Sequence, residues 1–279
     1  MPVTQIRGID ISYEILGDRG PFIALQPGGR RGAVAVRSLG QKIAEAGYRV
    51  IVYDRRNTGA SSVAIEGESE NDVWSEDLHE LLGKLDALPA YIGGSSSGCR
   101  LAMILALRHP EDVRGLLLWR VTGGQHAARH LSNQYYTSHI EAAKSGGMAA
   151  VCAMEHWSEV IKANPASRDR LLAMNPQDFI NRMTRWRESF DAGSDHAVTG
   201  LSPADLRSIT VPACIIPGND RVHPRNPGQV AHRLMPNSEY REVFAEDRMD
   251  VDVAFEDWEK KEGLLAAIFI DFLRRQQRR

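Results

Sequence analysis

Three serines between two glycines, Gly94-Ser95-Ser96-Ser97-Gly98, have the residue types and spacing best suited to chemistry. The apolar residues 90–92 precede them and the apolar run 101–107 follows, which predicts a buried strand, a sharp turn and a helix. In the pattern Gly-x-Ser-x-Gly only Ser96 is central, and such a turn projects its hydroxyl above the sheet. The N–H of Ser97 would then begin the helix, where partial positive charge stabilises an oxyanion. The segment predicts a nucleophile, with a simple Gly/Ser connection as the alternative.

Strand and helix patterns alternate on both sides of this turn. Strands are expected around residues 3–7, 9–15, 22–25, 49–54, just before Gly94, and at 113–119, 211–217 and 239–244. Helical patterns are expected over about 14 residues ending near Gly47, over 72–88, and over 263–275. This alternation predicts the α/β class: a mainly parallel sheet of about eight strands with helices on both faces.

Residues 122–208 have a different pattern from the rest of the chain. They contain many helix-forming residues, including Trp157 and Trp186, and no strand-like run. The pairs Asn164-Pro165 and Asn175-Pro176 interrupt the helical pattern. We therefore expect a helical lid at 122–208, inserted into a core formed by residues 1–121 and 209–279.

Four segments, in this order, resemble the α/β-hydrolase superfamily. They are residues 25–29 (LQPGG), residues 53–62 (YDRRNTGASS), the serine turn at 94–98, and residues 218–224 (GNDRVHP). The resemblance extends over nearly the whole chain. It implies the α/β-hydrolase fold, with a mostly parallel sheet of about eight strands and an inserted helical lid.

The resemblance also implies roles for particular residues. Ser96 resembles the nucleophile of the family. The N–H of Ser97, together with that of Gly29 or Arg30, resembles the oxyanion hole. Asp220, which lies 124 residues beyond Ser96, resembles the acid that orients the catalytic base.

One element of the family pattern is missing from its usual place. The family's base is a histidine in the loop after the last strand, but residues 243–252 (VFAEDRMDVD) contain none. The chain has nine histidines, of which His232 is the last. General-base assistance is typically worth about 10²–10⁴-fold in rate, so the missing group bears directly on the reaction.

Three alternatives remain for this group. A histidine from elsewhere could reach Ser96: His223 in the loop with Asp220, or His126 or His130 at the entrance to the lid. A carboxylate could serve if burial raises its pKa toward neutrality; the candidates are Glu246, Asp247 and Asp250. In the third alternative, the site has abandoned acyl transfer and keeps only its pocket and oxyanion donors.

Candidate substrate-binding residues are both cationic and aromatic. Arg120 ends a core strand, and ligands of open α/β sheets bind beyond the carboxyl ends of the strands. With Arg30 and Arg31 it could form a cationic pocket for a carboxylate, unless these arginines pair with acidic residues. Trp119 and Trp157 could wall the pocket. Packing between lid and core explains the tryptophans equally well.

Composition excludes several classes of function. The chain has 279 residues, a net charge of −2 and 43% apolar residues, so nucleic acid is not an expected partner. Its three cysteines are isolated, and we expect neither a disulfide framework nor a metal site nor a bound cofactor. No apolar run is long enough for a bilayer and no signal-peptide pattern is present, which predicts a cytoplasmic protein without a membrane partner.

These observations favour a hydrolase that acts on a small-molecule ester, lactone, amide or activated C–C bond. Ser96 would be its nucleophile, working with a non-standard base. Two alternatives remain open on the same scaffold: a lyase or cofactor-free proton-transfer enzyme, and a catalytically silent protein that binds small molecules.

Overall fold

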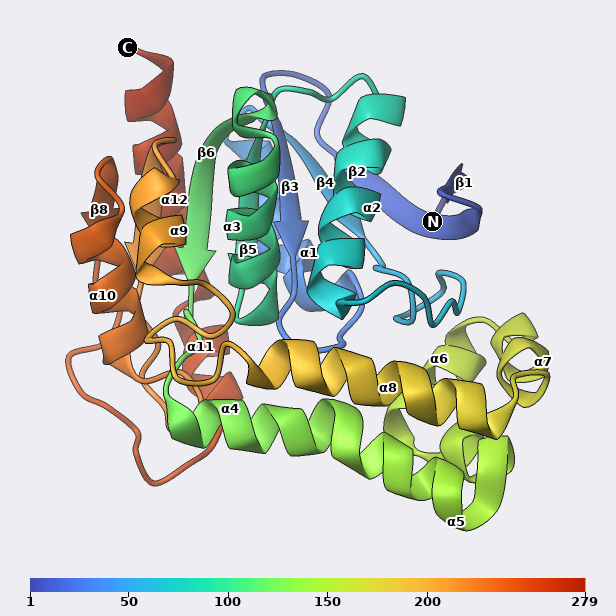
Figure 1. The fold of residues 1–279 in the computed structure, drawn as a ribbon. Coiled ribbons are helices and arrows are strands. Elements are labelled where there is room, and N and C mark those ends of the chain that lie inside the picture. Colours follow the sequence, from blue (N-terminus) through green and yellow to red (C-terminus); the bar gives the residue numbers. More distant parts are fainter. Residues whose placement is uncertain (279) are drawn as a thin grey trace.

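An eight-stranded sheet organises the computed structural model, which describes residues 1–278 (Figure 1). The strand order is β1-β2-β4-β3-β5-β6-β7-β8. Only the β1–β2 and β2–β4 pairs are antiparallel. The strands are β1 (Val3–Ile6), β2 (Ile9–Leu16), β3 (Phe22–Gln26), β4 (Arg49–Tyr53), β5 (Ala90–Ser95), β6 (Val113–Trp119), β7 (Ala213–Ile216) and β8 (Ser238–Tyr240). The predicted α/β class and mostly parallel sheet are confirmed.

Helices cover both faces of the sheet. Alternate strand residues enter two separate apolar clusters: Ala24 belongs to one, and its neighbours Ile23 and Leu25 belong to the other. The first cluster includes α2 (Glu70–Lys84), α3 (Ser97–Arg108), α9 (Pro203–Ser208) and α10 (Arg225–Leu234). The second includes α1 (Val34–Glu45), α11 (Phe255–Lys260) and α12 (Glu262–Gln277). Burial on both faces explains why the central strands are almost continuously apolar.

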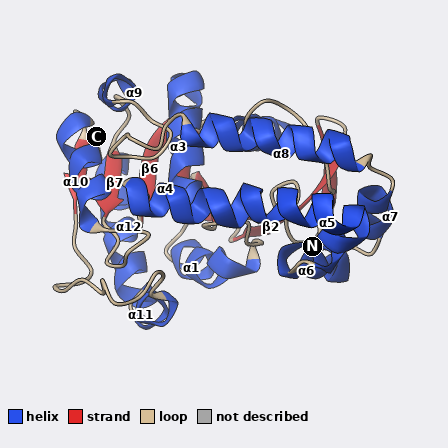
Figure 2. Ribbon diagram, turned by 60° about the horizontal axis from the view of Figure 1, so that its bottom comes forward, coloured by secondary structure: helices blue, strands red, loops and turns tan. Residues whose placement is uncertain are grey.

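Between β6 and β7 the chain is helical. The elements are α4 (Gln125–Ser132), a π-helical turn (Asn133–Thr137), α5 (Ser138–Ala153), α6 (Glu155–Ala163), α7 (Ala166–Leu172), α8 (Pro176–Asp191) and α9. Helices α4, α5 and α8 lie beyond the carboxyl end of β6, and α8 runs beside α4 and α5 (Figures 1 and 2). A third apolar cluster, which contains Trp157 and Trp186, holds these helices together.

The Asn-Pro pairs of the sequence mark helix starts in this region. Asn175 accepts hydrogen bonds from the N–H groups of Gln177 and Asp178 in the first turn of α8. Pro176 occupies the first position of α8, where a missing N–H costs nothing. Pro165 immediately precedes α7. In the part of the chain that the structure describes, no helix has both the length and the apolarity that a membrane crossing requires.

The last strand is shorter than the expected 239–244. It ends at Tyr240, and the chain then leaves the edge of the sheet. Beyond it, the N–H of Arg248 donates to the carbonyl of Asn219, and the N–H of Arg221 donates to that of Val251. Because these bonds go to the loop after β7 rather than to a strand, the segment 248–254 packs against that loop.

Candidate active site

Ser96 occupies the turn between β5 and α3 in a backbone conformation that non-glycine residues rarely adopt. Its φ and ψ angles are 55° and −113°. A Cβ on Gly94 would overlap the backbone of Gly98, so the tight turn requires glycine there. A Cβ on Gly28 would lie 2.9 Å from the Cβ of Ser96. The strained turn and the close neighbours together fix the direction of the Ser96 hydroxyl.

A histidine and an aspartate lie in line with this hydroxyl. The Oγ atom of Ser96 is 2.9 Å from Nε2 of His223, and Nδ1 of His223 is 2.7 Å from Oδ1 of Asp220. The backbone N–H of His223 donates to the same Oδ1 at 2.8 Å. The other oxygen, Oδ2, accepts from the N–H of Ala254 at 3.0 Å and from Nη2 of Arg120 at 3.2 Å. Both carboxylate oxygens of Asp220 are therefore hydrogen-bonded, and the imidazole is held between the carboxylate and the serine.

The charges of this group are set by burial and by one arginine. Burial alone would raise the pKa of the Asp220 carboxyl, but the hydrogen bond from His223 and the charges of His223 and Arg120 lower it to about 2. Burial and the Arg120 charge lower the pKa of His223 to about 4, despite the opposing effect of Asp220. At neutral pH the aspartate is therefore ionised and the imidazole is neutral, the state in which it can accept a proton.

The hydrogen-bond directions follow from these charge states. A neutral imidazole carries one proton, and Nδ1–H donates to Asp220, so Nε2 accepts from Ser96. Oγ1 of Thr122 lies 2.9 Å from Oγ of Ser96. Because the Ser96 proton points to His223, the Thr122 hydroxyl donates to Ser96. This second contact holds the serine rotamer that faces the histidine.

Three backbone N–H groups near Ser96 have no hydrogen-bond acceptor within residues 1–278. They belong to Gly29, Arg30 and Ser97. Arg55, which is 1% exposed, links the loop that contains Gly29 to the start of α3. Its Nη1 donates to Oγ of Ser97, and its Nη2 donates to the carbonyl of Gly29. Sequence reasoning missed Arg55, although it lies in the quoted segment 53–62. Its position after β4, whose carboxyl end is beside that of β3, was the available signal.

Comparisons with known proteins agree with the observed fold. The family described as "alpha/beta hydrolase fold" matches residues 21–133. The Bacillus subtilis protein "Uncharacterized hydrolase YraK" is 37% identical over 114 residues, which are 40% of this chain and 41% of YraK. The chain therefore aligns with less than half the length of this relative. Residues 21–133 of the chain are therefore similar to the α/β-hydrolase family.

More distant similarities extend over most of the chain. The mouse protein "sn-1-specific diacylglycerol lipase ABHD11" is 26% identical over 250 residues, covering 86% of this chain and 79% of that protein. The crystal structure of an enol-lactonase from Burkholderia xenovorans LB400 superposes with a TM-score of 0.66. It is 18% identical, and the match covers 98% of this chain and all of the other. That structural likeness shows that the chain has the α/β-hydrolase fold.

The other candidates for the base do not reach Ser96. His126 is half-exposed and pairs with Asp252 at 3.1 Å. His130 lines the cavity that contains Ser96, but within the described residues it is not hydrogen-bonded to the serine. Two of the three candidate carboxylates bind surface arginines, Asp247 to Arg225 and Asp250 to Arg248, and Glu246, like them, is exposed. Of the candidate bases, only His223 is hydrogen-bonded to the Ser96 hydroxyl.

Ser96 opens into a cavity of about 840 Å³. Trp119, Arg120 and His223 also line it, whereas Trp157 does not. The expectation that Trp157 walls the pocket is wrong, because this side chain is 0% exposed and donates its indole N–H to His139. Arg120 is not a free cation either. It pairs with Asp220, so the alternative of an internal salt bridge holds for this residue.

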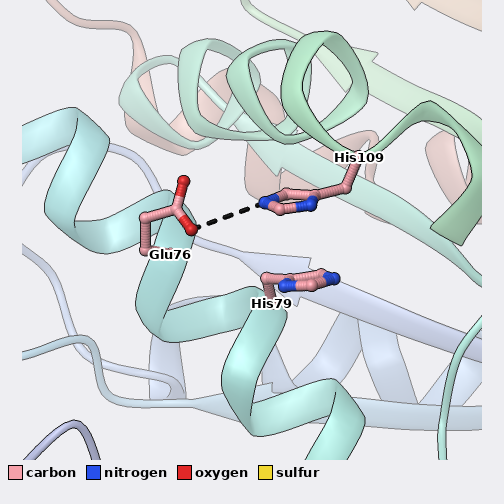
Figure 3. A group of neighbouring side chains, drawn as sticks. All are labelled: Glu76, His79 and His109. Atoms are coloured by element: carbon pink, nitrogen blue, oxygen red, sulfur yellow. Dashed lines mark hydrogen bonds and ion pairs between the residues drawn. The ribbon is translucent and has the colours of Figure 1, made fainter.

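A second group of polar side chains lies far from this cavity. Glu76, His79 and His109 bring potential metal-ligand atoms within 4.8 Å of one another (Figure 3). The imidazole rings stack at 3.7 Å, His109 contacts Glu76, and Arg108 donates to the other oxygen of Glu76 at 2.8 Å. His109 follows the C-terminal end of α3, roughly 18 Å along the helix from Ser96. No local sequence pattern indicated this group, because its two histidines lie 30 residues apart.

Proposed function

We propose that the protein is a serine hydrolase that acts on small-molecule esters, lactones, amides or activated C–C bonds. Ser96 is the nucleophile, His223 is the general base, and Asp220 orients the base. The observation that carries this proposal is the hydrogen-bonded chain from Ser96 Oγ through both ring nitrogens of His223 to the Asp220 carboxylate. Such a chain activates a hydroxyl that is otherwise a weak nucleophile.

The first half of the reaction forms an acyl-enzyme. Ser96 Oγ bonds to the carbonyl carbon, its proton passes to Nε2 of His223, and the carbonyl π electrons move onto oxygen. When the carbonyl re-forms, the bond to the leaving group breaks, and His223 returns its proton to that group. Asp220 stays ionised and stabilises the imidazolium, consistent with its lowered pKa of about 2.

The second half releases the acid product. His223 takes a proton from water, the water oxygen bonds to the acyl carbon, and the bond to Ser96 breaks as the serine regains a proton. Ser96, His223, water and the substrate supply every proton and electron pair, so the proposal requires no cofactor. The N–H groups of Ser97 and of Gly29 or Arg30 are the proposed oxyanion donors, and the positive charge of Arg55 lies beside them.

The proposed substrates are small molecules because the reacting hydroxyl lies in a bounded cavity. A volume of about 840 Å³ is within the range of ligand pockets. Residues of α4 to α6, such as Leu131, Tyr135 and Val160, form part of its wall. We therefore propose residues 122–208 as the lid over a core of 1–121 and 209–279.

Covalent labelling by a fluorophosphonate probe, read by peptide mass spectrometry, tests the proposal. We expect one adduct on Ser96, its loss in Ser96→Ala, and its retention in the matched control Ser95→Ala. Hydrolysis of short esters should follow the same pattern. Tight binding of small molecules without labelling would favour the silent binder. Turnover that survives Ser96→Ala would favour the lyase or proton-transfer class.

A further inference from the structure

Two hydrogen-bond donors face each other at the wall of the cavity. Nη1 of Arg30 lies 3.4 Å from Nε2 of His139, and both residues line the cavity that contains Ser96. On the other side of the imidazole, the indole N–H of Trp157 donates to Nδ1 of His139 at 2.9 Å. Because indole nitrogen is a donor only, Nδ1 carries the lone pair.

The remaining ring nitrogen must therefore carry the proton. Burial, with Arg30 and His156 as neighbours, lowers the pKa of His139 to about 2, so its ring is neutral with one N–H, at Nε2. Arginine has no lone pair to offer. The contact between Arg30 and His139 is thus two N–H groups side by side, and neither satisfies the other. An acceptor placed before them would satisfy both.

Glu70 holds one edge of the Arg30 guanidinium. Its Nε and Nη2 lie 3.0 Å and 3.2 Å from the two oxygens of Glu70, which leaves Nη1 to face His139. The Arg30 side chain is 4% exposed, so Nη1 does not face bulk water. In sequence, Arg30 directly follows Gly29 in the loop whose N–H groups lie near Ser96. Arg30 and Ser96 also line the same cavity, so a group bound by Arg30 shares that cavity with the reacting carbonyl.

The buried charges around this point are unbalanced. Three buried guanidinium groups, those of Arg30, Arg55 and Arg100, influence one another or the same carboxylate, Glu70. Arg55 binds only a serine hydroxyl and a carbonyl. Arg100 binds a carbonyl and the side chain of Asn71. Within the described residues, Glu70 is the one carboxylate that forms an ion pair with any of these three cations, so an added anion offsets a cost that burial imposes.

We propose that Arg30 Nη1 and His139 Nε2 form a carboxylate subsite, so that the substrates are esters, lactones or amides that also carry a carboxylate. The two N–H groups bind its oxygens while the carbonyl to be cleaved lies at Ser96.

Five carboxylates also line the cavity: Asp54, Glu155, Glu159, Glu259 and Glu262. The buried Asp54 accepts hydrogen bonds from the N–H groups of Ala33 and Ala60, and Glu262 pairs with Lys42. The other three are exposed, and water screens their charge. The buried donors therefore decide which ligand binds. The substrate class rests on the proposed function, whereas the subsite itself requires only binding.

Calorimetric binding to the Ser96→Ala protein tests the subsite without catalysis. The probes are monomethyl glutarate and its neutral isostere, the corresponding methyl ester amide. We expect the acid to bind at least tenfold more tightly than the amide. Because His139 stays neutral, this preference should not change between pH 6 and pH 8. Equal binding of the two probes would overturn the proposal.

Two substitutions remove one donor each and preserve the surroundings. Arg30→Lys keeps a positive charge beside Glu70 but lacks Nη1, and His139→Asn keeps an acceptor for Trp157 but lacks Nε2–H. In the Ser96→Ala background, each substitution should weaken binding of the acid about tenfold and leave binding of the amide unchanged. Arg19→Gln, which removes an exposed cation that does not line the cavity, is the control and should change either affinity less than threefold.

The outcomes separate this proposal from the proposed function. An unchanged ratio of acid to amide affinity in the folded variants would overturn the subsite even if Ser96 reacts with the fluorophosphonate. A strong preference for the acid that both substitutions abolish would support the subsite even if Ser96 does not react. If one variant does not fold, the other still decides.

Discussion

The loops after β7 and β8 leave neighbouring parallel strands at the same edge of the sheet, yet they have opposite character. In the loop after β7, Asp220 is 0% and His223 4% exposed, and both are hydrogen-bonded inside the molecule. In the loop after β8, Glu246, Asp247 and Asp250 are exposed. Burial, not the presence of ionisable residues, distinguishes the loop that approaches Ser96.

The second loop supports the first through its backbone. Backbone N–H groups of the first loop donate to carbonyls of the second at 3.1 Å; the pairs are Arg221 with Val251 and Val222 with Asp252. The N–H of Ala254 donates to Oδ2 of Asp220. A Cβ on Gly218 would overlap His223, so this residue can turn close to the imidazole only as glycine. The second loop thus holds in place the loop that carries both Asp220 and His223.

The largest expected effect is a difference in kcat/KM between variants of the loop after β7 and variants of the loop after β8. His223→Ala should lower kcat/KM for a short ester by about 10²–10⁴-fold, because Ser96 loses its proton acceptor. Glu246→Gln and Asp250→Asn, the matched controls in the other loop, should change it less than threefold. Steady-state hydrolysis measures both effects. If a carboxylate variant were as impaired as His223→Ala, the assignment of the base would be wrong.

The next effect concerns pH. His223 must be unprotonated to accept the Ser96 proton, and burial and Arg120 lower its pKa to about 4. As pH falls, kcat/KM should therefore stay level to about pH 5 and then decline tenfold per unit below pH 4. Removing the positive charge in Arg120→Met should raise the pKa of His223 and move this decline to higher pH.

The control for the pH profile is a check that the protein remains folded at each pH. Circular dichroism at each pH, with activity recovered after return to pH 7, separates protonation of His223 from acid unfolding. A decline centred near pH 6.5 in the unmodified protein would indicate an imidazole in a water-like environment. That result would contradict the buried loop.

The smallest effect probes the support of the catalytic loop. The indole N–H of Trp258 donates to Oδ1 of Asn219 at 2.8 Å, next to Asp220. Trp258→Phe leaves that buried oxygen without a donor and should reduce the free energy of unfolding by about 1–3 kcal/mol. Urea titration measures this loss, and kcat/KM should change less than tenfold. No loss of stability would mean that the loop does not depend on α11.

Sequence reasoning reached the fold because its signals are local. The apolar run 22–25, the strand before Gly94 and the helical pattern over 72–88 each depend on neighbouring residues. The position of Ser96 followed from the steric demands of a five-residue turn. The Asp220 carboxylate was also placed in the correct loop. In each case the physical cause, either periodic burial or a backbone that needs glycine, lies within a few residues.

The partner of the serine could not be found in that way. His223 was only one of several candidates, because 127 residues separate it from Ser96 and nothing local shows how its loop turns. The available signal was that His223 follows Asp220 by three residues, because an aspartate carboxylate can accept a hydrogen bond from the backbone of its own loop. Arg55, and the facing donors of Arg30 and His139, emerge only from packing among distant segments.

By itself, the sequence determined an α/β sheet and the sharp turn that carries Ser96, since turn sterics and hydrophobic periodicity act between near neighbours. Only the tertiary structure decided which imidazole meets the serine and which cations remain unpaired. Both depend on burial and on hydrogen bonds from remote parts of the chain, such as Ala254 to Asp220 and Trp157 to His139. Burial and pairing exist only once the whole chain has folded.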